Sequence, residues 1–422
     1  MTKQMCGAQL YSLSSGGKLL TAQTSVRDVV VIEGSILGGS NHLAKNLDTI
    51  PSLLAGLLDA GTKKKSKEVI REALADRGIS LSFSAGGDRT YFSGHCLPED
   101  LSFLLSTIVE CLSEAHFPLS EVKTIKTRTL GNLAEMKTDT GTQASIALTR
   151  ALYDTDHLNF SRTLDEREKG VRDTDRSDLT TFKKMLGRNG LVLAVAGDIH
   201  PVVVQKAVEK AFANLHSTGV LAIEKRANKK VAVAIEKIIP IPDKANIDVL
   251  LGASLPLHTL DPLYHSAFLL TEMLGGGFAS HLMQTIRERD GLTYGVYAGL
   301  RGFGDGTDGY MRISATFSPE KYKQSVEALR REIGIFFSTG LTENALQKKK
   351  DEISGSYLVG LSTTQGLART LHQLTIDGRA LSYLDQRLDL IRAVSLADLH
   401  TVADFVHLDK LSLVASGTFP KK

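Results

Sequence analysis

The sequence is poor in the features that mark several classes of protein. Three cysteines, Cys6, Cys96 and Cys111, among 422 residues are too few and too scattered for a disulfide framework or a cysteine metal cluster. Their odd number favours a reducing compartment. No run of about 18 apolar residues is present, so no membrane span is expected. A net charge of +3 gives no reason to expect a nucleic-acid surface.

The N-terminus and the bulk composition indicate an ordinary globular chain. The Met1–Leu10 stretch has no basic start followed by an apolar segment, so no signal peptide is expected. A cytoplasmic location is therefore predicted, with a periplasmic location as the alternative if a leader has been removed. Hydrophobic residues make up 42% and charged residues 23%, as in soluble globular proteins. The length is too great for one compact core and suits two to four domains.

The chain contains two copies of one unit. Gly78–Leu81 aligns with Gly291–Tyr294 at an offset of 213 residues. The apolar segment Leu191–Ala196 aligns with Leu411–Ser416 at an offset of 220 residues. Matching segments that keep their order at nearly constant offsets indicate an internal duplication.

The two copies define the predicted domains. The segment 218–230 is polar, basic and poorly periodic, so it is the predicted linker between an N-terminal domain at 1–217 and a C-terminal domain at 231–422. Each copy has strands at its start, helices and two further strands in its middle, and long helices before a closing strand. This order predicts an α+β fold with two homologous domains in tandem, each a mostly antiparallel sheet covered by helices on one face.

Period-two alternation between glycines predicts the strands, and longer periodic stretches predict the helices. The strands are expected at Gln9–Thr21, Val29–Leu37, Ile79–Ala85, Arg89–Cys96 and Leu191–Ala196, and at Val231–Ile239, Asn246–Gly252, Leu292–Arg301, Gly309–Phe317 and Leu411–Ser416. The helices between them are expected at Asn46–Leu58, Ser66–Asp76, Pro262–Leu274 and Phe278–Arg289.

A glycine-rich turn and an arginine–tyrosine pair mark the second copy. Gly275, Gly276 and Gly277 precede a predicted helix, and Arg287 near its end stands seven residues before Tyr294. With these residues and its two-copy layout, the chain resembles the pitrilysin/insulinase zinc metallopeptidases. The resemblance is strongest to their short bacterial members, which are similar to the mitochondrial processing peptidase subunits. It covers nearly the whole chain.

The catalytic signature of that family is absent from the first copy. The family carries an inverted zinc motif, H-x-x-E-H, just before a Gly-Thr pair, which here is Gly61-Thr62. The preceding window Ser52–Gly56 holds no zinc ligand and no general base, and no two of the twelve histidines stand three to five residues apart. Glu135 lies near the expected place of the family's downstream glutamate, but one carboxylate is not a zinc site. We expect no metal and no other cofactor in this chain.

The resemblance implies a catalytic role for Arg287 and Tyr294. A guanidinium and a phenol can both donate hydrogen bonds to a peptide carbonyl, and these strengthen as the oxygen gains negative charge. The structural alternatives are an arginine on a solvated helix face and a strand tyrosine half-packed into a core. The first copy has Leu74 and Leu81 at the equivalent positions, so the fold of that copy does not need the polar pair.

The resemblance implies a non-zinc subunit of a heterodimeric zinc peptidase. In this hypothesis the chain binds an unfolded peptide, which the turn at Gly275–Gly277 approaches closely. Arg287 and Tyr294 stabilise the oxyanion, while a homologous partner supplies zinc and H-x-x-E-H. The chain alone would be inactive. The alternative is a catalytically silent structural or peptide-binding subunit, resembling the core proteins of a respiratory complex. A homodimer also stays open; neither nucleic acid nor a membrane is expected as a partner.

Overall fold

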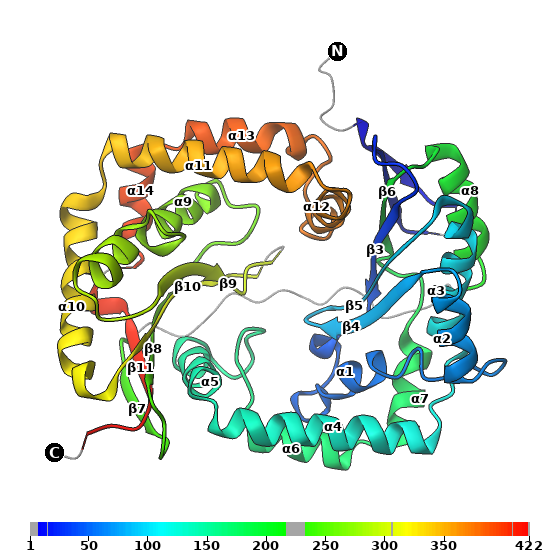
Figure 1. Cartoon of the computed structure of the whole chain (residues 1–422), viewed down its shortest axis with the longest axis horizontal. Helices are drawn as coiled ribbons and strands as arrows, with labels where there is room; N and C mark the ends of the chain where they lie inside the picture. Colours follow the sequence, from blue (N-terminus) through cyan, green and yellow to red (C-terminus); the bar gives the residue numbers. More distant parts are fainter. Residues whose placement is uncertain (1–6, 15, 217–232, 305–306, 407, 421–422) are drawn as a thin grey trace. The chain divides into compact units, whose positions relative to one another are not determined.

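The computed structural model describes residues 7–14, 16–216, 233–304, 307–406 and 408–420. It is an α+β structure with two sheets, each flanked by helices (Figure 1), as the sequence predicts. The residues form two compact units that are discontinuous in sequence: 1–133 with 164–224 and 357–385, and 134–163 with 225–356 and 386–422. These units differ from the division into 1–217 and 231–422, because each takes in helical segments from the other half of the chain. The expected linker lies outside the described residues.

The first unit is built on a six-stranded sheet with the order β1-β2-β6-β3-β5-β4. β2 and β6 run parallel, and all other neighbours run antiparallel. Its strands are β1 (Gln9–Ser12), β2 (Lys18–Gln23), β3 (Val30–Leu37), β4 (Ser80–Gly86), β5 (Arg89–Cys96) and β6 (Val192–Gly197).

The main core of the first unit lies on one face of this sheet, under α3 (Leu101–Glu114) and α8 (Pro201–Phe212). Gly34 of β3 pairs with Phe92 of β5, and the Phe92 ring fills the space that a side chain at position 34 would occupy. The same ring stacks on Phe212 at a centroid distance of 6.0 Å. The other helices of this part are α1 (Ile50–Ala55), α2 (Lys67–Ala75), α4 (Leu119–Thr138), α6 (Leu164–Asp173) and α7 (Arg176–Met185).

The second unit is built on a five-stranded sheet with the order β7-β11-β8-β10-β9. β7 and β11 run parallel and the other neighbours antiparallel, as in the matching part of the first sheet. Its strands are β7 (Glu236–Pro240), β8 (Ile247–Ser254), β9 (Val296–Arg301), β10 (Tyr310–Phe317) and β11 (Ser412–Gly417). The order leaves β9 at one edge of the sheet.

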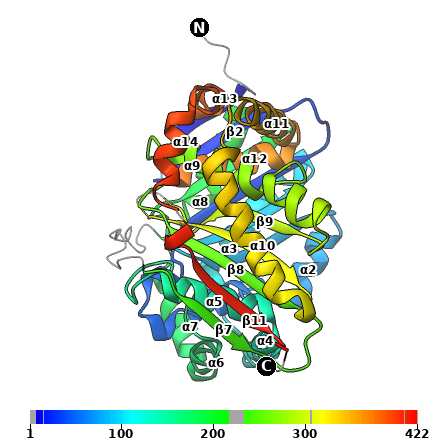
Figure 2. The same ribbon diagram turned by 90° about the vertical axis from the view of Figure 1, so that its left-hand side faces the viewer.

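Helices cover one face of this second sheet. In Figure 2, α9 (Tyr264–Gly275), α10 (Tyr322–Ile335) and α14 (Leu396–Ala403) lie in front of the strands. They enclose a core that includes the alternate β8 residues Val249 and Leu251, since alternate side chains of a strand point to one face. Two further helices are α11 (Glu343–Leu361) and α13 (Tyr383–Ala393).

The opposite face of each sheet carries one helix from a distant part of the chain. α12 (Thr364–Ile376) contacts β2, β3 and β6 of the first sheet, and α5 (Thr140–Leu152) contacts β7, β8 and β11 of the second. The first turn of each helix hydrogen-bonds to an acid on the central strand. Gln365 donates to Glu33 of β3, and Thr140 donates to Asp248 of β8. Because helix and strand are far apart in sequence, the order of elements does not predict this second covered face.

Most element positions agree with the sequence, and two differences concern the expected site. The helix expected at Phe278–Arg289 is a π-helix at Met283–Arg289. β9 starts at Val296 rather than at residue 292, so Tyr294 lies before the strand. Cys96 and Cys111 are buried and unpaired, as small apolar residues would be. No helix within the described residues has the length and apolar character needed to cross a membrane.

A buried polar cluster joins α12 to the first sheet. Ser35 Oγ of β3 lies 2.8 Å from His372 Nε2 and accepts a hydrogen bond of 2.7 Å from Arg89 Nε. The Ser35 hydroxyl proton is then available to a neutral imidazole. Burial, and secondarily the charge of Arg89, lowers the pKa of His372 to about 4. Burial raises the pKa of the nearby Glu33 carboxyl. Neutral His372 therefore stabilises the docking of α12.

We expect His372→Gln to reduce the loss of stability on acidification. The pKa of His372 is depressed in the folded state, so the unfolded chain binds more protons below its ordinary value of 6.5. The stability due to the neutral ring is present above that value and is lost as pH falls toward 4. Between pH 7 and pH 5 this loss is about 2 kcal/mol in the free energy of unfolding. The raised pKa of Glu33 acts in the opposite sense, so only the difference between variants isolates His372.

Urea unfolding of the wild type, His372→Gln and His95→Gln at pH 7 and pH 5 measures this difference. His95 is an exposed histidine on the same sheet and serves as the matched control. An unchanged pH dependence in His372→Gln would contradict the assignment.

Candidate functional site

The π-helix Met283–Arg289 carries the predicted arginine. Met283 and Ile286 are buried in the core of the second unit, which anchors one side of the helix. The backbone N–H of Gly291 donates to the carbonyl of Arg287, and Gly291 has φ +60°, which lets the chain turn toward β9. π-helical turns are uncommon and are often found at functional sites.

A network of charges fixes the C-terminal end of this helix to α10. Glu332 Oε1 accepts hydrogen bonds of 2.8 Å from Arg289 Nη2 and 3.0 Å from Arg331 Nε. Burial raises the pKa of the Glu332 carboxyl, but these two bonds outweigh it and hold the pKa below its usual value. His281 Nε2 lies 3.1 Å from the Glu332 carbonyl oxygen, so His281 helps to position the helix. The backbone under the candidate site is therefore well fixed.

The Arg287 guanidinium lies at the surface, on the π-helix that these contacts hold in place. Its side chain is 33% exposed, and within the described part of the chain its one ion pair is a 3.5 Å contact with the neighbouring Glu288. The Arg287 Cζ atom lies 5.2 Å from the centre of the Phe278 ring, which is itself 70% exposed. An arginine held by one exposed carboxylate and one ring keeps most of its donors available. Phe278 was not predicted as part of the site.

Tyr294 projects almost wholly into solvent. Its residue exposure is 98%, and its hydroxyl has no hydrogen-bond partner among the described residues. The backbone beside it is held in place, because Thr293 Oγ1 donates to the carbonyl of Thr316 at 2.7 Å and accepts from the N–H of Gly295 at 3.2 Å. The alternative of a strand tyrosine half-packed into a core is therefore wrong, since the residue precedes β9 and touches no core.

The three glycines of the turn have different surroundings. A Cβ on Gly275 would lie 2.5 Å from the backbone nitrogen of Ala298, so this glycine lets α9 approach β9. A Cβ on Gly276 would lie 2.0 Å from the Glu272 carboxylate. At Gly277 the nearest atom would be the Glu352 carboxylate oxygen at 3.4 Å. Gly277 is the member of the turn with the most open space.

The residues at the expected zinc position do not fit a metal. The window lies on α1, where Leu53, Leu54 and Ala55 are buried, and Ser52 donates to the carbonyl of Thr49 at 2.9 Å. No side chain of this window could ligate zinc. Glu135 is exposed on α4. Within the described ranges, no three histidine, cysteine or acidic side chains gather as a metal site requires.

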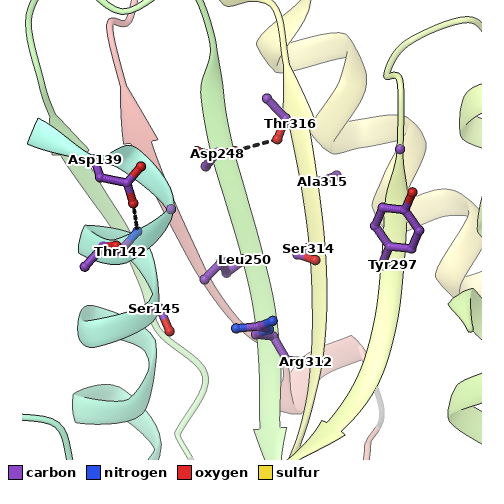
Figure 3. A pocket seen from close by; sticks show the side chains of 12 residues that line it. Asp139, Thr142, Ser145, Asp248, Leu250, Tyr297, Arg312, Ser314, Ala315 and Thr316 are labelled. Atoms are coloured by element: carbon purple, nitrogen blue, oxygen red, sulfur yellow. Dashed lines mark hydrogen bonds between the residues drawn. The ribbon is translucent and has the colours of Figure 1, made fainter. Parts of the chain in front are cut away.

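A pocket of about 490 Å³ lies beside the candidate site, within the second unit (Figure 3). Gly295 and Tyr297, which closely follow Tyr294, line it together with residues of α5, β8 and β10. Arg312 of β10 is its one arginine. The sequence analysis missed this residue, because an arginine in an alternating strand carries no local signal of a pocket.

Known proteins are similar to this chain over part or nearly all of its length. Residues 176–353 match the family model described as Peptidase M16 inactive domain. A Helicobacter pylori protein named Non-peptidase homolog YmxG is 23% identical over 372 residues, spanning 87% of this chain and 83% of its own length. A Bacillus subtilis protein named Uncharacterized zinc protease YmxG is 23% identical over 416 residues, spanning 97% and 99%.

Solved structures agree on the fold. The crystal structure of a peptidase M16 inactive domain from Pseudomonas fluorescens superposes with a TM-score of 0.88 at 21% identity, covering 98% of each chain. The family model, the relatives and this fold confirm the pitrilysin/insulinase resemblance drawn from the glycine turn and the Arg287–Tyr294 pair. Residues 176–353 therefore match the Peptidase M16 inactive-domain model, the fold is that of a solved M16 structure, and the sequence lacks the H-x-x-E-H zinc motif.

Proposed function

We propose that this chain is the non-zinc subunit of a two-chain zinc peptidase. It binds unfolded peptide and donates hydrogen bonds from Arg287 and Tyr294 to the scissile carbonyl. A homologous partner chain supplies the metal, its ligands and the general base. The observation that carries the proposal is the exposure of Tyr294, at 98%, on a backbone that Thr293 holds in place. A side chain displayed in this way contributes nothing to packing, so it is available to another molecule.

The arginine supports the same role. Arg287 remains charged at any physiological pH, and its nearest carboxylate, on Glu288, is itself exposed and can be displaced. The Glu332 network holds the end of the helix that carries it. Donors on a rigid backbone are preorganised, so they stabilise a developing oxyanion without reorganising during the reaction.

The edge strand offers a place for the peptide. β9 stands at the end of its sheet, and Tyr294 lies two residues before it. An extended peptide can add to an exposed sheet edge through main-chain hydrogen bonds. A peptide held there would run close to the Tyr294 hydroxyl. The partner contributes the metal-activated water, and this chain orients the carbonyl and stabilises its negative charge.

The alternative is a peptide-binding or structural subunit without turnover. One relative is named a non-peptidase homolog, which favours this reading for that protein. In this chain, the partly exposed Arg287 and the exposed Tyr294 favour participation in cleavage. The two functions differ in whether loss of the pair changes turnover or leaves it unchanged.

We expect Arg287→Ala and Tyr294→Phe to lower turnover without weakening assembly. Each removes one oxyanion donor, which should reduce kcat by about a hundredfold or more. The measurement combines this chain with a homologue that carries H-x-x-E-H and follows cleavage of an unfolded peptide, with complex formation measured by ultracentrifugation. Arg330→Ala, which removes a partly exposed arginine on α10, is the matched control. Full turnover in both site variants would favour the silent-subunit alternative.

We expect substitution of Gly275 to affect packing of the fold and substitution of Gly277 to affect peptide binding. Gly275→Ala places a Cβ against the β9 backbone and should lower the free energy of unfolding by about 1–3 kcal/mol. Gly277→Ala should leave stability within about 0.5 kcal/mol, because only a flexible carboxylate is near. Chemical denaturation measures the stability of both variants, and peptide-binding anisotropy measures the affinity of Gly277→Ala. If Gly277→Ala binds peptide as the wild type does, the turn has no part in binding.

A further inference from the structure

The pocket of the second unit is polar and has two chemically different ends. Its floor is the sheet face opposite the main core, and its wall is the first part of α5 (Figure 3). Along β10 the alternate residues Arg312, Ser314 and Thr316 face it. Thr316 pairs with Asp248 of β8, whereas Arg312 pairs with Gly252 on one side and Gly299 on the other. The acidic and basic ends are four strand residues apart, roughly 13 Å.

The guanidinium at the basic end has no counterion among the described residues. Arg312 is half-buried, and no hydrogen bond or ion pair joins it to any residue in the described part of the chain. Burial lowers the pKa of Arg312, and the charge of Arg301 on the neighbouring strand lowers it further. Two arginines close enough to repel each other favour the binding of an anion.

Two hydroxyls beside Arg312 are also without partners. Ser145 of α5 and Ser314 of β10 line the pocket, and neither side chain hydrogen-bonds to another described residue. Figure 3 shows Arg312 and Ser145 toward the same end of the pocket. Together they present a planar fork of N–H donors and two O–H donors. This donor set matches the geometry of a carboxylate, which accepts bidentate hydrogen bonds from arginine.

The acidic end of the pocket is already satisfied. Asp248 accepts from Thr140 and, at 2.5 Å, from Thr316 Oγ1. Asp139 caps α5 by accepting from the N–H of Thr142 at 2.7 Å. These two carboxylates add negative charge, which opposes a second anionic group in the same ligand. A ligand with a single negative charge suits the pocket better than a polyanion such as a phosphate dianion.

We propose that this pocket binds the carboxylate of an acidic residue in an extended peptide, with Arg312 as its ion-pair partner. The proposal rests on the peptide binding proposed above and adds a specificity to it. Gly295 and Tyr297 of the pocket adjoin Tyr294. The acidic side chain of the peptide therefore binds close to the carbonyl that Tyr294 would contact. Arg312 is a specificity-determining residue and takes no part in the reaction itself.

The test compares two peptides of about ten residues, acetylated and amidated at their ends, that differ only in one glutamate or glutamine. Fluorescence anisotropy measures their affinities for the full-length wild type, Arg312→Gln, Arg312→Lys and Arg330→Gln. We expect the wild type and Arg330→Gln to prefer the glutamate peptide by about tenfold. Arg312→Gln should lose this preference, and Arg312→Lys should keep part of it, because the charge remains without the fork.

The outcomes separate this inference from the proposed function. If both peptides bind, and the preference for the glutamate peptide is the same in Arg312→Gln as in the wild type, the carboxylate site is overturned and peptide binding stays intact. Binding of neither peptide overturns both. If inorganic phosphate displaces the glutamate peptide at concentrations where acetate does not, the pocket is a phosphate site and the proposal fails. Weak competition by both anions, with the preference lost only in the Arg312 variants, supports it.

Discussion

In each unit, a helix from a distant part of the chain crosses the sheet face opposite the main core, and its first turn bonds to an acid on the central strand. The Gln365–Glu33 and Thr140–Asp248 contacts join residues 332 and 108 positions apart. A half-buried carboxylate must be hydrogen-bonded, so each acid selects the position of its helix. In the second sheet, α5 covers β7, β8 and β11 and leaves the side of β9 open. The docking of α5 therefore determines which part of this sheet face can bind another molecule.

The candidate functional residues lie on or near the β9 side of the second sheet, which α5 does not cover. Tyr294 and the pocket with Arg312 lie at or beside β9, and Arg287 stands on the short π-helix before it. Hydrogen bonds hold the backbone around them: Glu332 accepts from two arginines, and the Thr293 hydroxyl bonds to the backbone of Gly295 and of Thr316. The side chains that project from this frame keep their donors. A firm backbone with unused donors is what recognition of a peptide carbonyl or carboxylate requires.

The two units share one strand topology but carry different residues at the positions that concern function. The strand order and directions of β2-β6-β3-β5-β4 recur in β7-β11-β8-β10-β9. At the position where the family carries zinc ligands, the first unit has buried leucine and alanine. Its opposite sheet face is closed by the neutral His372 cluster, which serves packing. The second unit keeps polar side chains exposed on the equivalent part of its own sheet. This asymmetry underlies the division of labour proposed with a zinc-bearing partner.

The sequence by itself determined most of the local elements and showed that the H-x-x-E-H motif is absent. Strand alternation and glycine boundaries depend on neighbouring residues, and the absence of H-x-x-E-H is a property of the string alone. Only the tertiary structure decided which helix covers which sheet, that Tyr294 is exposed, and that Arg312 faces a pocket in which no described residue pairs with it. Those facts depend on contacts such as Ser35 with His372, 337 residues apart. Local periodicity holds no information on such contacts, because they are selected by packing and by the pairing of buried polar groups.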